Sequence, residues 1–417
     1  MSFDPDRTSG VVIILILIYV LVMLIRSANA LFIFSLTQSY ELKTLSQGII
    51  QGAYSLTEAL SGFIAGFLYE YLGSVRSLIL STILLVVSYT LSQIIYSLNL
   101  DPMYLLIPQI IGGFSAAFII VSSIALLAEE TIRFTFRGRL IGAGGLETSN
   151  LGGYAIGFLI AGFLEIRGSS LLRGFITPLI SVILALSLSI YLSSRIHVER
   201  RSMSTGRELI SVERRSLNLI PMWSGVALIL GVAFISPRIL KNMISIETSS
   251  TESGLGHLFV IAILLLSAGI LAGSYVSSIL GRVRALGVGV FSAPLLLILL
   301  GYLVPEIIRQ NMFHILSSYR YVSLLVLTAL LGLLSLTIPP TLLALLAEYT
   351  DRSRFRGPAS GVYVTTLGLG IFIGNILGGY IFDHYGFQIL TILLATIFTP
   401  LGVSTYVLVK RSHESRW

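Results

Sequence analysis

The chain has 417 residues, of which 55% are hydrophobic and only 11% are charged. A soluble domain carries roughly 25% charged residues, so this composition excludes an ordinary soluble protein and predicts an integral membrane protein. The chain has no cysteine, which excludes disulfides and thiolate metal ligands. The net charge of +7 is not carried by a soluble basic domain. We therefore interpret it as topogenic arginine in membrane loops rather than as a surface for nucleic acid.

Twelve apolar stretches are long enough to cross a bilayer, which takes about 20 residues in a helix. The first stretch is too long for a signal peptide, and neither a basic region nor a small-residue cleavage site accompanies it, so we expect a retained helix. The sequence thus predicts an all-α integral membrane fold. The predicted spans are residues 11–37, 45–69, 77–98, 103–128, 139–164, 173–194, 220–245, 256–279, 285–304, 319–347, 357–382 and 388–409.

One sequence pattern occurs twice and indicates two related halves. Residues 125–138 read ALLAEETIRFTFRG and residues 344–357 read ALLAEYTDRSRFRG, with ten of fourteen positions identical. In each copy an apolar run ends in Ala-Glu, passes through an arginine cluster and restarts after Arg-Gly. This is the pattern of a helix that leaves the membrane, a short charged turn and a helix that returns. Repeated halves of this kind are typical of secondary transporters.

A single long polar linker separates the first six predicted spans from the last six. Residues 195–218 hold six arginines and three glutamates. We therefore predict an N-terminal six-helix bundle at residues 1–194, a basic cytoplasmic linker at 195–219 and a C-terminal six-helix bundle at 220–417. The linker is either a short amphipathic helix on the membrane surface or a flexible topogenic segment.

The basic residues are strongly biased to one side of the predicted topology. When both termini are placed in the cytoplasm, most of the arginines fall on the inner side, as the positive-inside rule requires. We expect a multi-pass protein of the plasma membrane with both termini cytoplasmic. The basic residues left on the outer side are Lys43, Arg167, Arg173, Lys241, Arg309 and Arg320.

The loop after the second span has a regular spacing of glycine, acid, glycine and base. It places Gly66, Glu70, Gly73 and Arg76 at intervals of four, three and three residues. The corresponding loop of the second half reads SILGRVR over residues 278–284, which keeps the spacing but replaces the acid with serine.

On these residues the chain resembles the major facilitator superfamily. The resemblance rests on the twelve spans, the basic central linker, the loop signature and the Glu-x-x-x-Arg and Arg-Gly elements after spans four and ten. The chain departs from the usual signature because Glu70 replaces the commoner aspartate and Tyr71 replaces a basic residue. The resemblance implies two pseudo-symmetric six-helix bundles around a central path, which rock about a site in the middle of the membrane.

The charges of these loops predict a contact between the halves. A carboxylate at Glu70 is expected near the positive N-terminal end of span eleven, which starts near Gly357. Because acids and arginines are interleaved, we predict a cytoplasmic latch that forms in one conformation and breaks in the other; the alternative is that these residues only anchor the topology. The predicted latch residues are Gly66, Glu70, Gly73, Arg76, Glu129, Arg133, Arg137, Gly281, Arg284, Glu348, Arg352 and Arg356.

Charges inside the predicted spans are candidate functional groups because they are costly in the membrane. Arg26 and Glu58 fall at comparable depth on the adjacent first and second spans, so they are candidates for an ion pair. Two interpretations remain open: Glu58 carries protons at a solute-binding wall, or the pair statically holds two helices together. Glu147 in span five is either a second protonation site, a gate partner or a carboxylate that reaches water.

Further polar residues extend this picture along helical faces. Arg238 either contacts an anionic solute or extends its side chain outward to the membrane surface. Pro339-Pro340 is predicted to interrupt span ten, which suits a helix that lines a cavity. The candidate residues for binding solute or protons are Arg26, Asn29, Gln51, Tyr54, Glu58, Glu147, Asn150 and Arg238.

From these features we expect a secondary active transporter that moves a small organic solute by alternating access, with proton coupling through Glu58 or Glu147 as a further hypothesis. The arginines favour anionic or polar solutes. The alternatives are a multidrug efflux antiporter, and a solute sensor or lipid-handling protein of the same fold. We expect no enzyme activity, no cofactor, no metal and no nucleic acid. The expected partners are a small-molecule substrate and the lipid bilayer, and we expect the protein to be a monomer.

Overall fold

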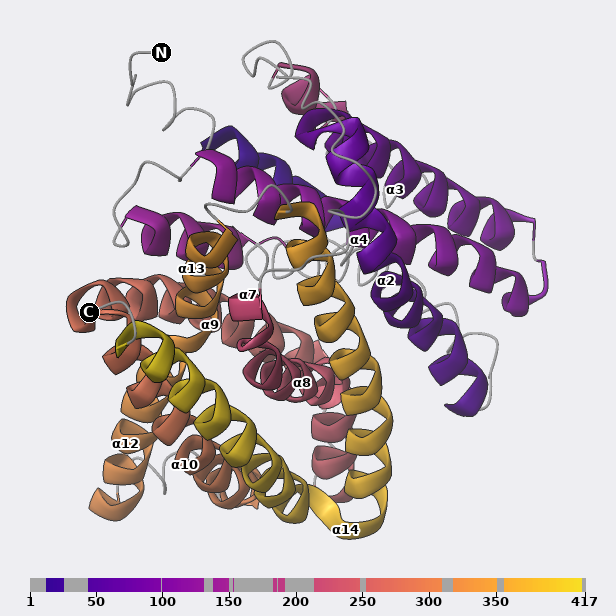
Figure 1. Ribbon diagram of the computed structural model, residues 1–417. Coiled ribbons are helices and arrows are strands. Elements are labelled where there is room, and N and C mark those ends of the chain that lie inside the picture. The colour runs from indigo at the N-terminus through magenta and orange to yellow at the C-terminus, as the bar shows by residue number, and fades with distance from the viewer. Residues whose placement is uncertain are drawn as a thin grey trace.

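The computed structural model describes residues 13–25, 44–98, 100–130, 138–149, 153, 183–185, 187–191, 214–247, 253–309, 318–350 and 356–414. Over these residues the protein is helical and contains no strand, as the sequence predicted (Figure 1).

The first half begins with a helix over residues 13–25, which is followed by α2 (Thr44–Leu72) and α3 (Ser74–Ser97). Gly73 joins these two helices with a φ of 82°, a conformation that suits glycine because it has no Cβ. The 3₁₀ helix η1 (Pro102–Leu105) leads into α4 (Leu106–Glu130). A further helix covers residues 138–149, and residues 183–185 and 187–191 are also helical.

The second half begins with a short helical segment and ends with the longest helix. Its elements are α7 (Arg214–Leu217), α8 (Ile220–Glu247), α9 (Ser253–Leu280), α10 (Arg282–Arg309), α12 (Tyr319–Ser335), α13 (Ile338–Thr350) and α14 (Arg356–Glu414).

Two turns of the second half depend on glycine. Gly281 separates α9 from α10 with a φ of 78°, in the same way that Gly73 separates α2 from α3. Gly386 bends α14 with a φ of 79°, so the chain reverses there and returns as a second helical arm. Figure 1 shows this bend at one end of the molecule, far from the C-terminus.

The predicted interruption of span ten is confirmed. α12 ends at Ser335 and α13 begins at Ile338, just before the two prolines. The hydroxyl of Thr337 in the break donates a hydrogen bond to the carbonyl of Ala285, at 3.1 Å, and thus ties the break to α10. The proline pair can occupy the first turn of α13 because the N–H groups that prolines lack have no helical acceptor there.

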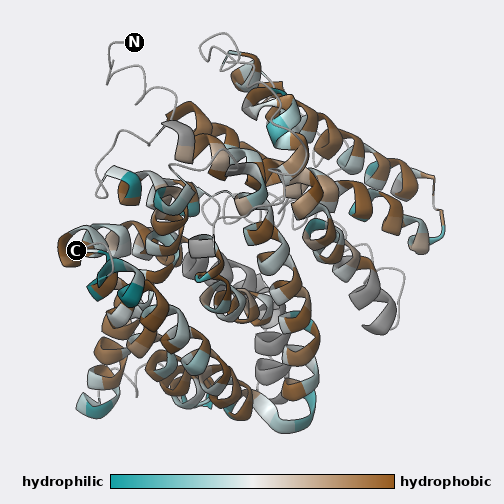
Figure 2. Cartoon of the chain, viewed as in Figure 1, coloured by the Kyte–Doolittle hydropathy of each residue, from teal (hydrophilic) through white to brown (hydrophobic). Residues whose placement is uncertain are grey.

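Among the described residues, five helical segments are long and apolar enough to cross a membrane. Shorter apolar helices cover Ile13–Ile25, Ile220–Ala233 and Leu264–Leu280. Figure 2 shows apolar residues along most of the helix lengths, as expected for a multi-pass membrane protein. The twelve-span layout itself stays a prediction. The five segments are Val75–Ile95, Pro102–Ala128, Arg282–Arg309, Tyr319–Thr350 and Gly357–Glu414.

Helices from the two ends of the sequence meet in the middle of the molecule. In Figure 1 the helices of the first half gather on one side and those of the second half on the other. The first arm of α14 packs against α8 of its own half and against α2 of the other half. Phe118 of α4 and Phe398 of α14 are among the largest side chains that are fully buried. α14 therefore links the two halves.

Several helix ends lie together at one end of the molecule. There α2 and α9 end, α13 ends and α14 begins, and the second arm of α14 returns to the same place (Figure 1). We call this the basic end, because its exposed cations include Arg76, Arg284, Lys410 and Arg411. The contacts described below all place these helix ends next to one another.

Candidate functional site

The two halves touch most closely where α2 crosses the first arm of α14. A Cβ atom added to Gly66 would lie 2.6 Å from the carbonyl oxygen of Gly357, and one added to Gly361 would lie 2.6 Å from that of Gly62. These neighbours are backbone atoms, which cannot move aside as a flexible side chain can. Gly66 is one of the predicted latch residues, and its partner helix is α14 of the other half.

A charged hydrogen bond closes this crossing at the basic end. The backbone N–H of Gly357 donates to Oε1 of Glu70 at 2.8 Å, although the two residues are 287 positions apart in the sequence. Gly357 lies in the first turn of α14, where N–H groups have no acceptor within the helix and the helix dipole is positive. A carboxylate is the side chain best suited to such a place.

A second contact between the halves lies between the helix of residues 138–149 and α9. A Cβ on Gly144 would overlap the Ser274 side chain, so these helices also touch. Further along the same pair, the hydroxyl of Thr148 donates to the carbonyl of Ser267 at 3.3 Å. The halves are therefore closed against each other along two helix pairs.

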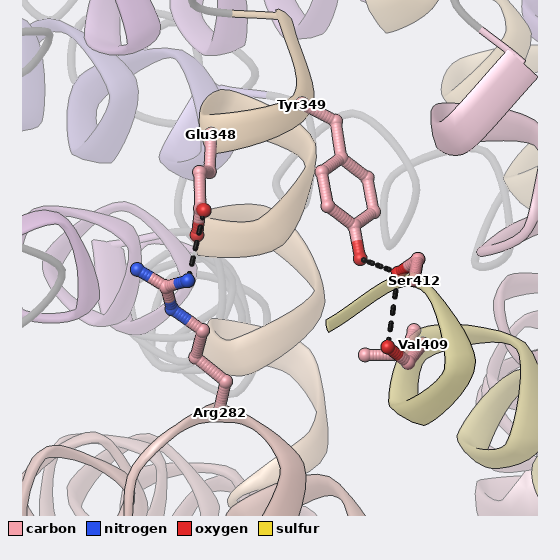
Figure 3. A network of polar contacts seen from close by, with 5 residues as sticks. All are labelled: Arg282, Glu348, Tyr349, Val409 and Ser412. Carbon is pink, nitrogen blue, oxygen red and sulfur yellow. Dashed lines mark hydrogen bonds and ion pairs between the residues drawn. The ribbon is translucent and has the colours of Figure 1, made fainter. Parts of the chain in front are cut away.

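The predicted latch residue Glu348 has a partner within its own half. Its carboxylate forms an ion pair with Arg282 at 2.9 Å, and its neighbour Tyr349 shares a hydrogen bond of 3.2 Å with Ser412 of α14 (Figure 3). These contacts join α13 to α10 and to the end of α14. Arg282 was not among the predicted latch residues, because its counterpart in the first loop is a serine, Ser74.

The other predicted latch residues are placed as follows. Arg76 and Arg284 are exposed, and Gly73 and Gly281 make the turns already described. For Glu129 and Arg356 the structure describes the helix position but not the side chain. Arg133, Arg137 and Arg352 lie outside the described residues.

A polar cluster lies deeper between the halves, around Tyr363 of α14. The Tyr363 hydroxyl lies close enough to the carboxylate of Glu147, in the helix of residues 138–149, to interact with it. Glu58 of α2 and Tyr19 of the first helix lie close enough to interact electrostatically with Tyr363. Tyr363 is only 6% exposed and Glu58 only 1%. Four helices thus bring two acids and two tyrosines together inside the molecule.

This cluster lies well inside the helices, away from the basic end. Tyr363 is six residues into α14 from Gly357, or about 9 Å of helix, and Glu58 is twelve residues from Glu70, or about 18 Å. Trp223 of α8 covers Tyr363, with ring centroids 4.0 Å apart. The site is therefore a buried polar group enclosed by an aromatic wall, with side chains from both halves.

The sequence identified the two acids of this cluster and missed its aromatic centre. Glu58 and Glu147 were predicted site residues, whereas Tyr363 carried only a weak signal from its position on a polar stripe of span eleven. Trp223 was not predicted, because it belongs to no polar or charged pattern along its helix. Its rarity was the only available signal, since the chain has only two tryptophans.

The remaining predicted site residues divide into three groups. Tyr54 is half-buried, and its ring lies beside Gly112 of α4, since a Cβ there would be 3.0 Å from the ring. Gln51 and Arg238 lie within α2 and α8, but their side chains are outside the description. Arg26, Asn29 and Asn150 lie outside the described residues, so the predicted Arg26–Glu58 pair stays a prediction. Across the described part of the chain, no three acids or histidines are grouped to hold a metal ion.

Comparison with known proteins places this architecture in a family. Residues 221–417 match the sequence model of the Major Facilitator Superfamily. The structure of the human organic anion transporter MFSD10 (TETRAN) is similar with a TM-score of 0.67 at 14% identity, over 97% of this chain and 100% of that one. No curated protein matches the chain in sequence.

Two structures of the transporter FucP have the same fold. One, in the outward conformation, has a TM-score of 0.67 at 12% identity over 95% of this chain and 98% of its own. The other, a variant of the E. coli fucose:proton symporter FucP, has a TM-score of 0.65 at 12% identity over 95% and 98%.

Apolar helices that enclose carboxylates between them are typical of membrane transporters. The C-terminal part of the chain matches the sequence model of the Major Facilitator Superfamily, and nearly the whole length has the fold of solved transporters of this kind. The resemblance predicted from the sequence is confirmed. Members of this superfamily are transporters and not enzymes.

Proposed function

We propose that this protein is a secondary active transporter that moves a small polar or anionic organic solute by alternating access, coupled to protons. One observation carries the proposal: Tyr363 of the second half lies close to Glu147 and Glu58 of the first half, inside the molecule. A binding site for both solute and proton must contact both halves if their movement is to expose it to each side in turn. The cluster around Tyr363 meets this requirement.

The two carboxylates suit a proton carrier because of where they lie. A charged carboxylate is costly inside a membrane unless a cation or a hydrogen bond compensates it, and a bound proton removes the charge. Protonation of Glu147 also removes the charged acceptor that Tyr363 contacts. Proton binding and the strength of the link between the halves are thereby connected at one pair of side chains. Glu58, almost fully buried, is the second carrier, and Arg26 is its predicted partner.

The basic end acts as the latch in this proposal. The Glu70–Gly357 hydrogen bond holds the halves together there. So does the close contact of α2 with α14 at Gly62, Gly66, Gly357 and Gly361, which we call the glycine crossing. Both contacts are broken when that end opens. Because α2 and α14 also approach at Gly52, where a Cβ would lie 3.2 Å from Phe372, the halves are in contact over most of this helix pair. We further propose that the basic end faces the cytoplasm of a plasma-membrane protein, with the halves at residues 1–194 and 220–417.

The descriptions of two structural neighbours are consistent with this substrate class. MFSD10 is described as an organic anion transporter and FucP as a fucose:proton symporter. At 12–14% identity they support the fold, and for this chain their solutes serve only as a guide to the compounds worth testing.

The test starts from ligand binding by the purified protein. Its unfolding temperature, followed by intrinsic fluorescence, is measured with sugars, organic acids, amino acids, phosphate and hydrophobic cations at two pH values. A ligand that binds only the folded state stabilises it by about 2.7 kcal/mol at a hundredfold excess over its Kd. We expect one saturable stabiliser among the polar or anionic compounds, and uptake of that compound into liposomes that contain the protein.

Other outcomes would contradict the proposal in identifiable ways. Broad, shallow stabilisation by hydrophobic cations would indicate a drug-efflux protein. A saturable ligand that the protein binds but does not carry into liposomes would indicate a sensor. Tyr363→Phe is the matching variant, because it keeps the ring against Trp223 and removes only the hydroxyl. It should fold as the unaltered protein does, so a loss of ligand stabilisation in this variant reports on the site and not on a folding defect.

A further inference from the structure

A cleft of about 470 Å³ opens at the basic end of the second half, away from the contact between the halves. It lies where α9 ends, α10 begins and the second arm of α14 ends. Its charged lining is mostly basic, and the residues concerned are Arg282, Arg284, Lys410, His413 and Glu414. None of the functions proposed above uses these side chains as a binding site.

Arg284 and Lys410 are the cations best placed to meet a ligand in this cleft. Both are exposed. Lys410 has Glu414 as a neighbour at 4.0 Å, but the two side chains are 53% and 65% exposed, so this ion pair contributes little. Arg282 instead points to Glu348 (Figure 3) and forms part of the cleft wall.

The level of the cleft is that of the membrane surface. α10 is apolar soon after Arg284, and α14 is apolar until Val409, so the cleft lies where the apolar segments end. Figure 2 shows hydrophilic residues gathered at this end of α14. The adjoining turns of α9 and α14 expose apolar side chains, which are Tyr275, Ile279, Val407 and Leu408.

We propose that this cleft binds the headgroup of an anionic phospholipid, with Arg284 and Lys410 on its phosphate. Basic pockets between membrane helices suit anionic headgroups, and the volume falls within the range of small-molecule sites. The exposed apolar turns beside the cleft give the acyl chains a surface, which a soluble phosphate compound does not need. This is why the proposal assigns the site to a lipid.

The test compares two variants that each lose two exposed cations. Arg284→Gln/Lys410→Gln removes the cations of the cleft. Arg76→Gln/Arg411→Gln is the matched control: Arg76 has the same place in the first loop as Arg284, and Arg411 is the exposed neighbour of Lys410 outside the cleft lining. Lipid binding by the full-length purified protein is measured by native mass spectrometry, with phosphatidylglycerol and phosphatidylcholine of the same acyl chains.

We expect the unaltered protein and the control to bind phosphatidylglycerol equally well and in preference to phosphatidylcholine. The cleft variant should bind phosphatidylglycerol about 30-fold more weakly, because each cation near an anionic surface contributes about a fivefold factor in affinity. Equal loss in both variants would overturn the proposal, since the charge effect would then be general. Binding without preference for phosphatidylglycerol would also overturn it.

A competition arm distinguishes lipid from soluble phosphate. Glycerophosphoglycerol, which is the deacylated headgroup and carries the same single charge without acyl chains, should displace phosphatidylglycerol only at a concentration at least a hundredfold higher. Displacement at equal concentration would assign the site to a soluble phosphate compound and contradict the lipid proposal. All four side chains are on the surface, so both variants should fold. An unfolding temperature without added lipid that equals that of the unaltered protein checks this.

Discussion

The carboxylate of Glu70 accepts a hydrogen bond from the backbone N–H of Gly357, and this bond joins the two halves of the molecule at the start of α14. Its acceptor comes from a side chain and its donor from a backbone. A substitution of Gly357 therefore keeps the N–H, whereas a substitution of Glu70 removes the acceptor. Glu70 is the residue through which the contact can be tested.

Glu70→Ala should open the basic end. Hydrogen bonds to charged groups contribute about 1.5–3 kcal/mol, so its loss should raise the fraction of molecules open at this end by about tenfold or more. The chain has no native cysteine, so a single reporter, Ser274→Cys, can be introduced where Ser274 is buried against Gly144. Its rate of reaction with N-ethylmaleimide measures the opening.

Glu70→Gln is the control for the same measurement. The amide oxygen can still accept from Gly357 but carries no charge, so the labelling rate should lie between those of the unaltered and alanine proteins. Identical labelling in all three proteins would contradict the proposed latch and leave Glu70 as a residue that only anchors topology.

The glycine crossing should tolerate no methyl group. Gly361→Ala puts a Cβ against the carbonyl oxygen of Gly62, so α2 and α14 must separate. We expect faster labelling of the Ser274→Cys reporter and a lower unfolding temperature. Gly379→Ala on the same helix is the matched control, because a Cβ there meets nothing within 4 Å. Gly379→Ala should be neutral or should stabilise the protein by up to about 1 kcal/mol. Equal effects of Gly361→Ala and Gly379→Ala would argue against the glycine crossing.

The sequence was most informative about the basic end. The acid at position 70 and the restart of the chain at Gly357 follow from local spacing, and a helix start attracts an acid whatever the rest of the fold. The interruption before Pro339 was predictable for the same reason, since proline acts on its own helix. These features depend on neighbours within a few residues, or on a contact that the repeated loop pattern indicates.

The central cluster was less predictable. Glu58 and Glu147 stood out because charges are rare in membrane helices, but nothing in the sequence shows that Tyr363 meets Glu147. That contact depends on how the two halves dock, and the position of Tyr363 on span eleven gives only a weak periodic signal. The Arg282–Glu348 pair was missed for a related reason: the repeat alignment offered no arginine at the matching place in the first loop.

Tyr363 and Glu147 should show energetic coupling. We propose a double-mutant cycle of Tyr363→Phe, Glu147→Gln and the combined variant, followed by the unfolding temperature. Removal of either partner abolishes their interaction, so the single effects should overlap by about 0.5–3 kcal/mol rather than add. Tyr349→Phe with Glu147→Gln should be additive, because Tyr349 bonds to Ser412 elsewhere. Additive effects in the first cycle would refute the contact between Tyr363 and Glu147.

The Arg282–Glu348 pair should respond asymmetrically to the loss of each partner. Glu348 is 10% exposed and Arg282 30%, so the arginine can turn to water more easily than the carboxylate can. Arg282→Gln should therefore lower the unfolding temperature more than Glu348→Gln does. Breaking a fully buried pair costs about 3–5 kcal/mol, and the partial exposure here should reduce that. The double change should recover part of the loss; a larger effect of Glu348→Gln would contradict this account.

The central claim is that solute and protons move together through the cluster around Tyr363. The most direct test is the internal pH of liposomes that contain the protein, followed with a trapped fluorescent indicator after the stabilising solute is added outside. We predict a pH change that depends on the solute in the unaltered protein. It should be absent in Glu58→Gln and Glu147→Gln variants that still bind the solute. Uptake of labelled solute without any pH change, at the same rate in all three proteins, would contradict the claim.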